Sequence, residues 1–128
     1  MKTQYTLALA VAFGFAAGAV AVHGLHAQAK LPAFSISEIE VTNADSFNTE
    51  FSPLAQKALA AYGAKALARG GKTASLYGDA PKVRIVINAF DSLDQAVAAF
   101  NSKAYKDAKA IGDKYGKFRI YAVEGLAN

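Results

Sequence analysis

The stretch KVRIVINAF, residues 82–90, alternates in the way that predicts a β-strand with apolar side chains on both faces. Successive side chains of a strand point to opposite faces of a sheet, so the stretch divides into two sets. One set is Val83, Ile85 and Ile87, and the other is Arg84, Val86, Asn88 and Phe90. Because both sets contain large aliphatic side chains, we expect this strand to lie in the middle of a sheet.

The stretch AFSISEIEV, residues 33–41, predicts another strand by the same alternation. Its apolar phase slips along its length. One face carries Phe34 and Ile36 together with Glu38 and Glu40, and the other carries Ile39 and Val41. The slip indicates either a β-bulge or a sheet that is at least partly covered on both faces.

An amphipathic helix is predicted between Asn43 and Gly63, where apolar residues recur at helical spacing. These residues are Phe47, Phe51, Leu54, Ala58, Leu59 and Tyr62. Asn43 is a favourable N-cap and Gly63 is a favourable stop. Pro53 lies inside this helix and has no amide hydrogen, so we expect a kink or a broken first turn near Ser52.

The rest of the chain predicts two strands besides the central one, and a second helix in two parts. A short strand at 64–69 is followed by a break or bulge at Gly70–Gly71, a continuation of that strand at 72–77 and a turn at 78–81. After the central strand, the second helix begins at Ser92 with a capping box to Gln95, restarts at Ser102 and stops at Gly112. A closing strand follows at 117–124. Serine favours such helix starts because its hydroxyl accepts a hydrogen bond from an amide of the first turn.

The resulting order is strand, helix, strand, strand, helix, strand. This order is typical of the α+β class and of the ferredoxin-like βαββαβ fold, in which two helices cover one face of an antiparallel sheet. Several side chains on the other face are apolar, and an isolated subunit would expose them to water as a contiguous patch. We therefore expect a homodimer that covers this face with a second copy of the chain.

The first 29 residues have the three parts of a secretory signal peptide. Lys2 precedes an uncharged apolar stretch at 3–22, and small residues follow at Ala27 and Ala29. Cleavage after Ala29 would leave a single domain at 30–128. We expect this domain to be exported across the inner membrane to the periplasm. Cleavage after Ala27 and a retained membrane anchor are the alternatives, and only the anchor would give the protein a membrane contact.

The composition excludes several kinds of chemistry from the expected mature domain. There is no Cys, both histidines (His23 and His26) lie in the signal, and the one methionine is Met1. Thiol nucleophiles, Ser-His triads, haem ligation and ordinary zinc or copper sites are therefore excluded, and we expect no metal and no cofactor. The chain carries a net charge of +4, but its lysines are scattered, so no nucleic-acid partner is predicted.

Glu38 is the strongest candidate for a catalytic base among the remaining residue types. It lies mid-strand between apolar neighbours, where a carboxylate must be paired or protonated if it is enclosed. Arg69, Arg84 or Asn88 could then hold a substrate oxyanion. A plain ion pair or a solvated side chain is the simpler interpretation of Glu38.

Two other groups are candidate ligand-binding residues. Arg69, Gly70 and Gly71 could present a guanidinium and backbone amides to an anion, although the same residues also fit a β-bulge. Tyr105 could reach a ligand from the second helix, or it could be a core residue with a hydrated hydroxyl.

Several short motifs in this order and spacing resemble the DUF1330 family. They are SEIEVT at 37–42, ARGGK at 68–72, YGD at 77–79, FDS at 90–92, FNSKAY at 100–105 and VEG at 123–125. The resemblance implies a dimeric α/β barrel, in which two ferredoxin-like sheets enclose a small barrel, and it implies little about activity. The chain departs from the family pattern at Ala99–Phe100, where a Trp-Tyr pair is usual, and at Gly112, where an arginine is expected.

Two functions are compatible with these residues. The first is a periplasmic homodimer that holds a small apolar or weakly acidic molecule in the barrel interior. The alternative is a cofactor-free isomerase, lyase or oxygenase that uses Glu38 as the base with Arg84 or Arg69 as its partner.

Overall fold

A computed structural model describes residues 30–127 of the chain. The predicted signal peptide at 1–29 lies outside the described residues. Within the described part, no helix combines the length and the apolar character that crossing a membrane requires.

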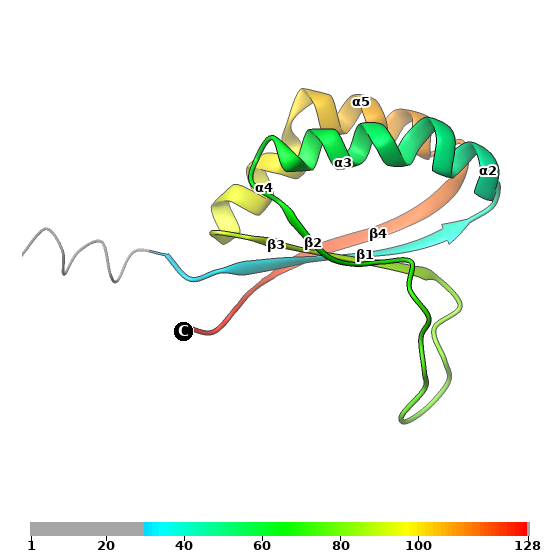
Figure 1. The fold of residues 1–128 in the computed structure, drawn as a ribbon, viewed down its shortest axis with the longest axis horizontal. Coiled ribbons are helices and arrows are strands. Elements are labelled where there is room, and N and C mark those ends of the chain that lie inside the picture. The colour runs from blue at the N-terminus through cyan, green and yellow to red at the C-terminus, as the bar shows by residue number, and fades with distance from the viewer. Residues whose placement is uncertain (1–29, 128) are drawn as a thin grey trace, which may run out of the picture. The chain divides into compact units, whose positions relative to one another are not determined.

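Four strands form one antiparallel sheet in the order β2-β3-β1-β4, and helices cover one face of it (Figure 1). The elements are β1 (Ala33–Val41), α2 (Ala44–Ser46), the π-helical turn η1 (Phe47–Phe51), α3 (Ser52–Ala60), β2 (Lys65–Arg69), β3 (Arg84–Phe90), α4 (Leu93–Asn101), α5 (Lys103–Gly112) and β4 (Gly116–Glu124). The structure confirms the predicted α+β, ferredoxin-like fold, and β1 and β3 are its central strands.

The first helical segment begins and is interrupted where the sequence predicts. The Asn43 side chain accepts a hydrogen bond of 3.2 Å from the amide of Ser46. The interruption before Pro53 takes the form of η1, in which the amide of Ser52 donates to the carbonyl of Phe47. A π turn widens the helix by one residue, and such turns are frequent at functional sites.

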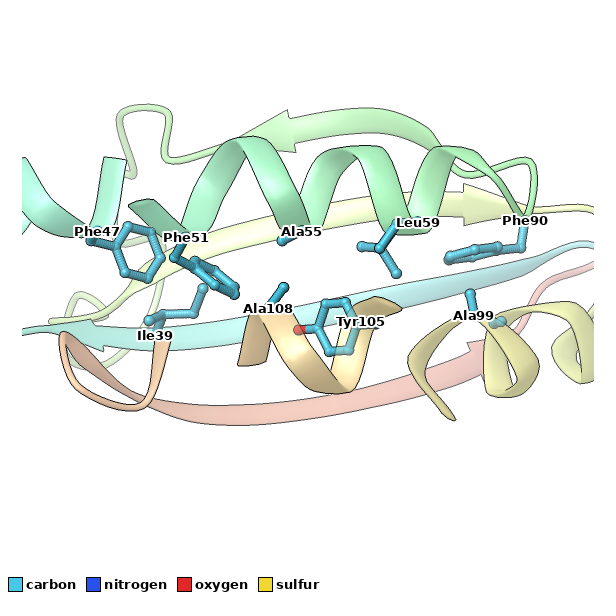
Figure 2. Close-up of a cluster of buried hydrophobic side chains, with 11 residues drawn as sticks. Ile39, Phe47, Phe51, Ala55, Leu59, Phe90, Ala99, Tyr105 and Ala108 are labelled. Carbon is cyan, nitrogen blue, oxygen red and sulfur yellow. The ribbon is translucent and has the colours of Figure 1, made fainter. Parts of the chain in front are cut away.

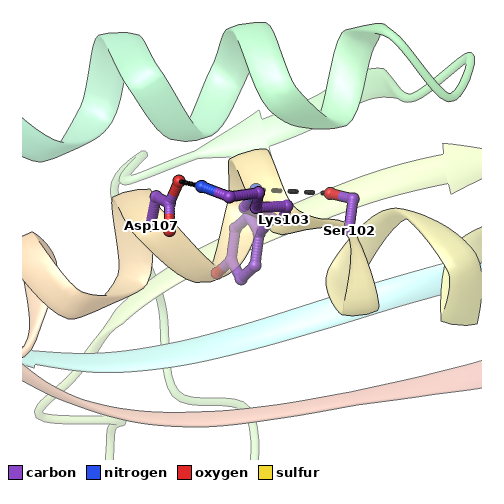
Figure 3. Close-up of polar contacts among 4 residues, drawn as sticks. Ser102, Lys103 and Asp107 are labelled. Atoms are coloured by element: carbon purple, nitrogen blue, oxygen red, sulfur yellow. Dashed lines mark hydrogen bonds and ion pairs between the residues drawn. The ribbon is translucent and has the colours of Figure 1, made fainter.

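The second helical region also follows its predicted capping residues. Ser92 accepts from the amide of Gln95, but the Gln95 side chain donates to the carbonyl of Tyr62 at 2.6 Å and so ties α4 to the end of α3. Ser102 accepts from the amide of Tyr105, and Lys103 pairs with Asp107 at 2.7 Å along the first turn of α5 (Figure 3).

The region after β2 differs from the prediction. The β-bulge lies between Ala66 and Ala68, not at Gly70–Gly71, and the predicted strand at 72–77 is part of an exposed loop. Gly70 has φ +63°, which turns the chain out of the extended conformation just after the ladder with β3 ends. Residues 72–77 therefore have no neighbouring strand to pair with.

The register of β1 decides between the two interpretations of its phase slip. Its pairing with β3 and with β4 is continuous, so β1 contains no bulge. The face that carries Ala33, Ser35, Ser37 and Ile39 is buried under the helices. The opposite face, which we call the open face, carries Phe34, Ile36 and Glu38, and these residues are only partly exposed.

An aromatic cluster forms the core between the helices and the sheet (Figure 2). The ring centroid of Phe51 lies 4.9 Å from that of Phe47 and 5.2 Å from that of Phe118. Ala99 has no exposed surface, so the helix residue that departs from the family pattern packs directly in the core.

Gly112, the other departure, lies where a side chain would collide with this cluster. A β-carbon there would lie 2.6 Å from the Phe51 ring and 3.0 Å from the Phe118 ring. We expect Gly112→Ala to lower the free energy of unfolding by about 1–3 kcal/mol through overpacking. The gain in helix propensity, at most about 1 kcal/mol, offsets only part of this cost at a helix end.

Urea denaturation of Gly112→Ala against Gly71→Ala tests this prediction. A β-carbon on Gly71 would meet nothing within 4 Å, so that variant should stay within about 0.5 kcal/mol of the parent. Equal midpoints for the two variants would show that the rings move aside without cost.

Candidate functional site

A cavity of about 260 Å³ lies between the sheet and the helical segment η1–α3. Its apolar wall comes from both layers. The large apolar residues in this wall are Ile39, Phe47, Phe51, Leu59 and Val86. The cavity is therefore on the helix-covered face of the sheet and within one subunit. The sequence interpretation instead placed a bound molecule in the barrel interior, on the open face.

The floor of the cavity is polar, although it lies within the buried layer. Ser37 and Asn88 line it and are 6% and 5% exposed. Ser35, which pairs with Asn88 across β1 and β3, is fully buried, and its hydroxyl has no hydrogen-bond partner within residues 30–127. Buried polar groups are normally satisfied, so this strip of polar side chains needs an explanation.

Arg84 presents a guanidinium to the cavity from β3. Its Nη1 donates to Asn48 Oδ1 at 3.1 Å, and its Cζ lies 5.5 Å from the centroid of the Phe47 ring. Its Nε is buried and has no hydrogen-bond partner among the described groups. The side chain is thus held by a hydrogen bond and by an aromatic ring, while its buried Nε has no partner among the described groups.

Arg69 lines the same cavity from the end of β2. None of the lining residues of the described chain is an Asp or Glu. Two guanidinium groups without a carboxylate give the cavity a positive potential, which favours an anionic guest.

Gly70 makes room for Arg84. A β-carbon on Gly70 would lie 2.7 Å from Arg84 Nε, and its φ of +63° also favours glycine. The Gly70 amide donates to the carbonyl of Ile85 at 2.9 Å, so it is not free to bind an anion as predicted. Gly71 is exposed and does not line the cavity.

Tyr105 lines the cavity from α5 and is 5% exposed. Burial, with a smaller contribution from the negative charge of Asp113, raises the pKa of its phenol to about 12. The phenol is therefore neutral at physiological pH. It can donate a hydrogen bond there, but it cannot serve as a base.

We expect Tyr105 to ionise well above the ordinary tyrosine pKa of about 10. The raised pKa means that the folded state holds its proton longer than the unfolded state. This contribution to stability is complete below the unfolded pKa and is lost as the pH rises through about 12. Phenolate formation is followed by near-ultraviolet absorbance in the parent and in Tyr105→Phe. The difference between the two titration curves should show the ionisation of Tyr105 at a pH well above the ordinary value. A difference curve centred near the ordinary value would contradict it.

Glu38 does not belong to this cavity. It lies opposite Ile85 and Arg119 in the sheet, on the open face, whereas Arg84 lies opposite Ile39 on the covered face. Its Oε2 is buried and lies 3.3 Å from Arg119 Nη1. The predicted pairing of Glu38 with Arg84, Arg69 or Asn88 is thus wrong within one subunit, because the sheet separates them.

The partner of Glu38 is Arg119, whose side chain is 77% exposed. Because the arginine is mostly in solvent, the pair contributes only about 0–1 kcal/mol to stability.

The sequence interpretation missed Ser37, Ser52 and Gln56, which also line the cavity. Ser37 carried a detectable signal, because it alternates with Ile39 on the apolar face of its strand. Ser52 and Gln56 carried none. Within residues 30–127, no cluster of three or more His, Cys, Asp or Glu side chains could hold a metal ion.

The sequence profile of a known family matches residues 32–126. The chain belongs to the DUF1330 family. This membership confirms the resemblance seen in the short motifs. DUF1330 is described as a domain of unknown function, so membership assigns no activity. No curated protein matches this DUF1330 chain significantly.

Solved structures with the same fold are distant in sequence from this DUF1330 protein. A protein of unknown function from Rhodopseudomonas palustris is 12% identical with a TM-score of 0.59, and the match covers 77% of this chain and 85% of that one. A Caulobacter crescentus protein provisionally named an antibiotic biosynthesis monooxygenase is 20% identical with a TM-score of 0.55, over 77% and 92% of the two chains. At these identities the likeness bears on the fold alone.

Proposed function

We propose that this DUF1330 protein binds a small molecule with an apolar body and an anionic or weakly acidic group. One observation carries the proposal: the cavity joins an apolar wall to two guanidinium groups and a buried polar floor. Small-molecule sites commonly have this composition, with a few convergent polar groups in a mostly apolar pocket.

The arrangement favours a particular orientation of the guest. An apolar body would lie against Phe47, Phe51 and Leu59, while an acidic group would accept hydrogen bonds from Arg84 and Asn88. The guanidinium of Arg84 is the group best suited to this role, since hydrogen bonds between charged groups are the stronger ones.

Binding is favoured over catalysis by the residues in the cavity. General base catalysis needs a group that accepts a proton near neutral pH. The lining residues offer arginines, a neutral Tyr105 and serines without a neighbouring base. The alternative enzyme with Glu38 as its base would have to work on the open face, away from the cavity and from Arg84.

We also propose that two copies associate through their open faces. No helix of the described chain covers this face (Figure 1). Its apolar residues are Phe34, Ile36, Ile85, Ile87, Tyr121 and Val123. A patch of this kind is characteristic of an interface and would be costly to leave hydrated.

Export to the periplasm completes the proposal. It is supported by the signal-like residues at 1–29. An intact mass that matches residues 30–128 in the periplasmic fraction would support it. An uncleaved chain that stays in the cytoplasm would contradict it.

The binding proposal is tested with benzoate and its neutral isostere benzamide as probes, using calorimetry. We expect the protein to prefer benzoate, and we expect Arg84→Met to weaken benzoate binding by roughly 10- to 100-fold while benzamide binding changes little. Arg119→Met, on the opposite face, is the matched control and should keep the preference. Equal affinity of the parent protein for both probes would refute an anion-selective cavity.

A further inference from the structure

We propose that the loop at 71–83, here called the arm, docks against a second copy of the chain and is anchored there by Leu76 and Tyr77. The inference rests on the homodimer proposed above and adds a second contact region to it. The arm joins β2 to β3 and has no regular secondary structure of its own.

The tip of the arm exposes two large apolar side chains next to each other. Leu76 is 87% exposed and Tyr77 is 98% exposed. The tip itself is a formed turn, because Gly78 has φ +74° and the Ser75 hydroxyl donates to the Gly78 carbonyl. A shaped turn therefore presents Leu76 and Tyr77 outward.

The arm makes few contacts with its own subunit. Residues 71–82 are exposed throughout. A β-carbon added at Gly71 or Gly78 would meet no described atom within 4 Å. The apolar tip thus lacks a packing surface within residues 30–127.

The direction of the arm identifies its partner. It hangs from one end of the sheet on the side away from the helices, which is the side of the open face (Figure 1). Six extended residues reach at most about 20 Å, whereas stacked sheets lie about 10 Å apart. A second copy seated on the open face therefore falls within reach of the arm.

Sedimentation velocity across a dilution series tests the contact between the arm and the second copy. The protein is expressed from the full chain and purified from its own host. We expect Leu76→Ser/Tyr77→Ser to weaken the dimer roughly 10- to 100-fold, as removal of interface anchors does. The matched control is Leu54→Ser/Val97→Ser, which removes two exposed apolar side chains from the helix layer, and it should leave the dimer unchanged.

The outcomes separate the arm from the dimer. A dimer of unchanged affinity in the arm variant would overturn the arm contact and leave the open-face dimer standing. A parent protein that is monomeric throughout would overturn both. Co-sedimentation with phosphatidylglycerol vesicles tests whether the tip binds a lipid surface instead. Loss of vesicle binding in the arm variant, with the dimer affinity unchanged, would identify the tip as a lipid contact and overturn the proposal.

Discussion

Phe47→Ala is expected to remove most of the stability of the folded domain. The Phe47 side chain is 2% exposed, and its ring contacts those of Phe51 and Phe118 and lies beside the Arg84 guanidinium. Truncation of a buried phenylalanine costs about 3–5 kcal/mol. Small domains have a total stability near the low end of about 5–15 kcal/mol, so the loss is a large fraction of it.

Urea denaturation followed by circular dichroism measures this loss. Phe47→Leu serves as the control, because it keeps an apolar group in the space and should cost substantially less than the alanine. An unfolding midpoint of Phe47→Ala close to that of the parent would show that the aromatic cluster repacks around the gap.

Ile87→Glu is expected to abolish the dimer while the subunit stays folded. Ile87 lies opposite Ile36 on the open face and is partly exposed in the single subunit. A carboxylate there can remain hydrated in a monomer. In an interface it would be buried and unpaired, at a cost of several kcal/mol. We expect the dissociation constant to rise by roughly 1,000-fold or more.

Native mass spectrometry and sedimentation together check this result. Ile87→Val should dimerise almost as the parent does, and Leu54→Glu places the same charge on the helix side, where no effect is expected. If Ile87→Glu and the parent sediment as the same species at all concentrations, the open face is not the interface. Loss of helical signal in Ile87→Glu would mean that the residue supports the subunit itself.

Local signals in the sequence were sufficient for most elements of the fold. Asn43, Ser92 and Ser102 each begin a helix at the predicted place, because a helix cap depends on a few neighbouring residues. The bulge in β2 could not be located in this way. It depends on the register between β2 and β3, and that register joins residues far apart in the chain.

The candidate site was predicted only in part for the same reason. Arg84 and Asn88 were correctly grouped on one face of their strand, and Glu38 was placed on a defined face of its own strand. The alternation within one strand shows which of its residues share a face. Only the pairing of Ile39 with Arg84 shows which face of β1 matches which face of β3. Once the strands are paired, Glu38 and Arg84 must lie on opposite sides of the sheet.

The π turn at Phe47–Phe51 makes the cavity sensitive to chain length as well as to side-chain identity. Deletion of one residue within this turn would restore α-helical spacing and rotate the preceding side chains by about 100°. Phe47 would leave the wall, and Asn48 would release Arg84. Relatives that differ by a single insertion or deletion here would then differ in ligand preference even where every lining residue is the same.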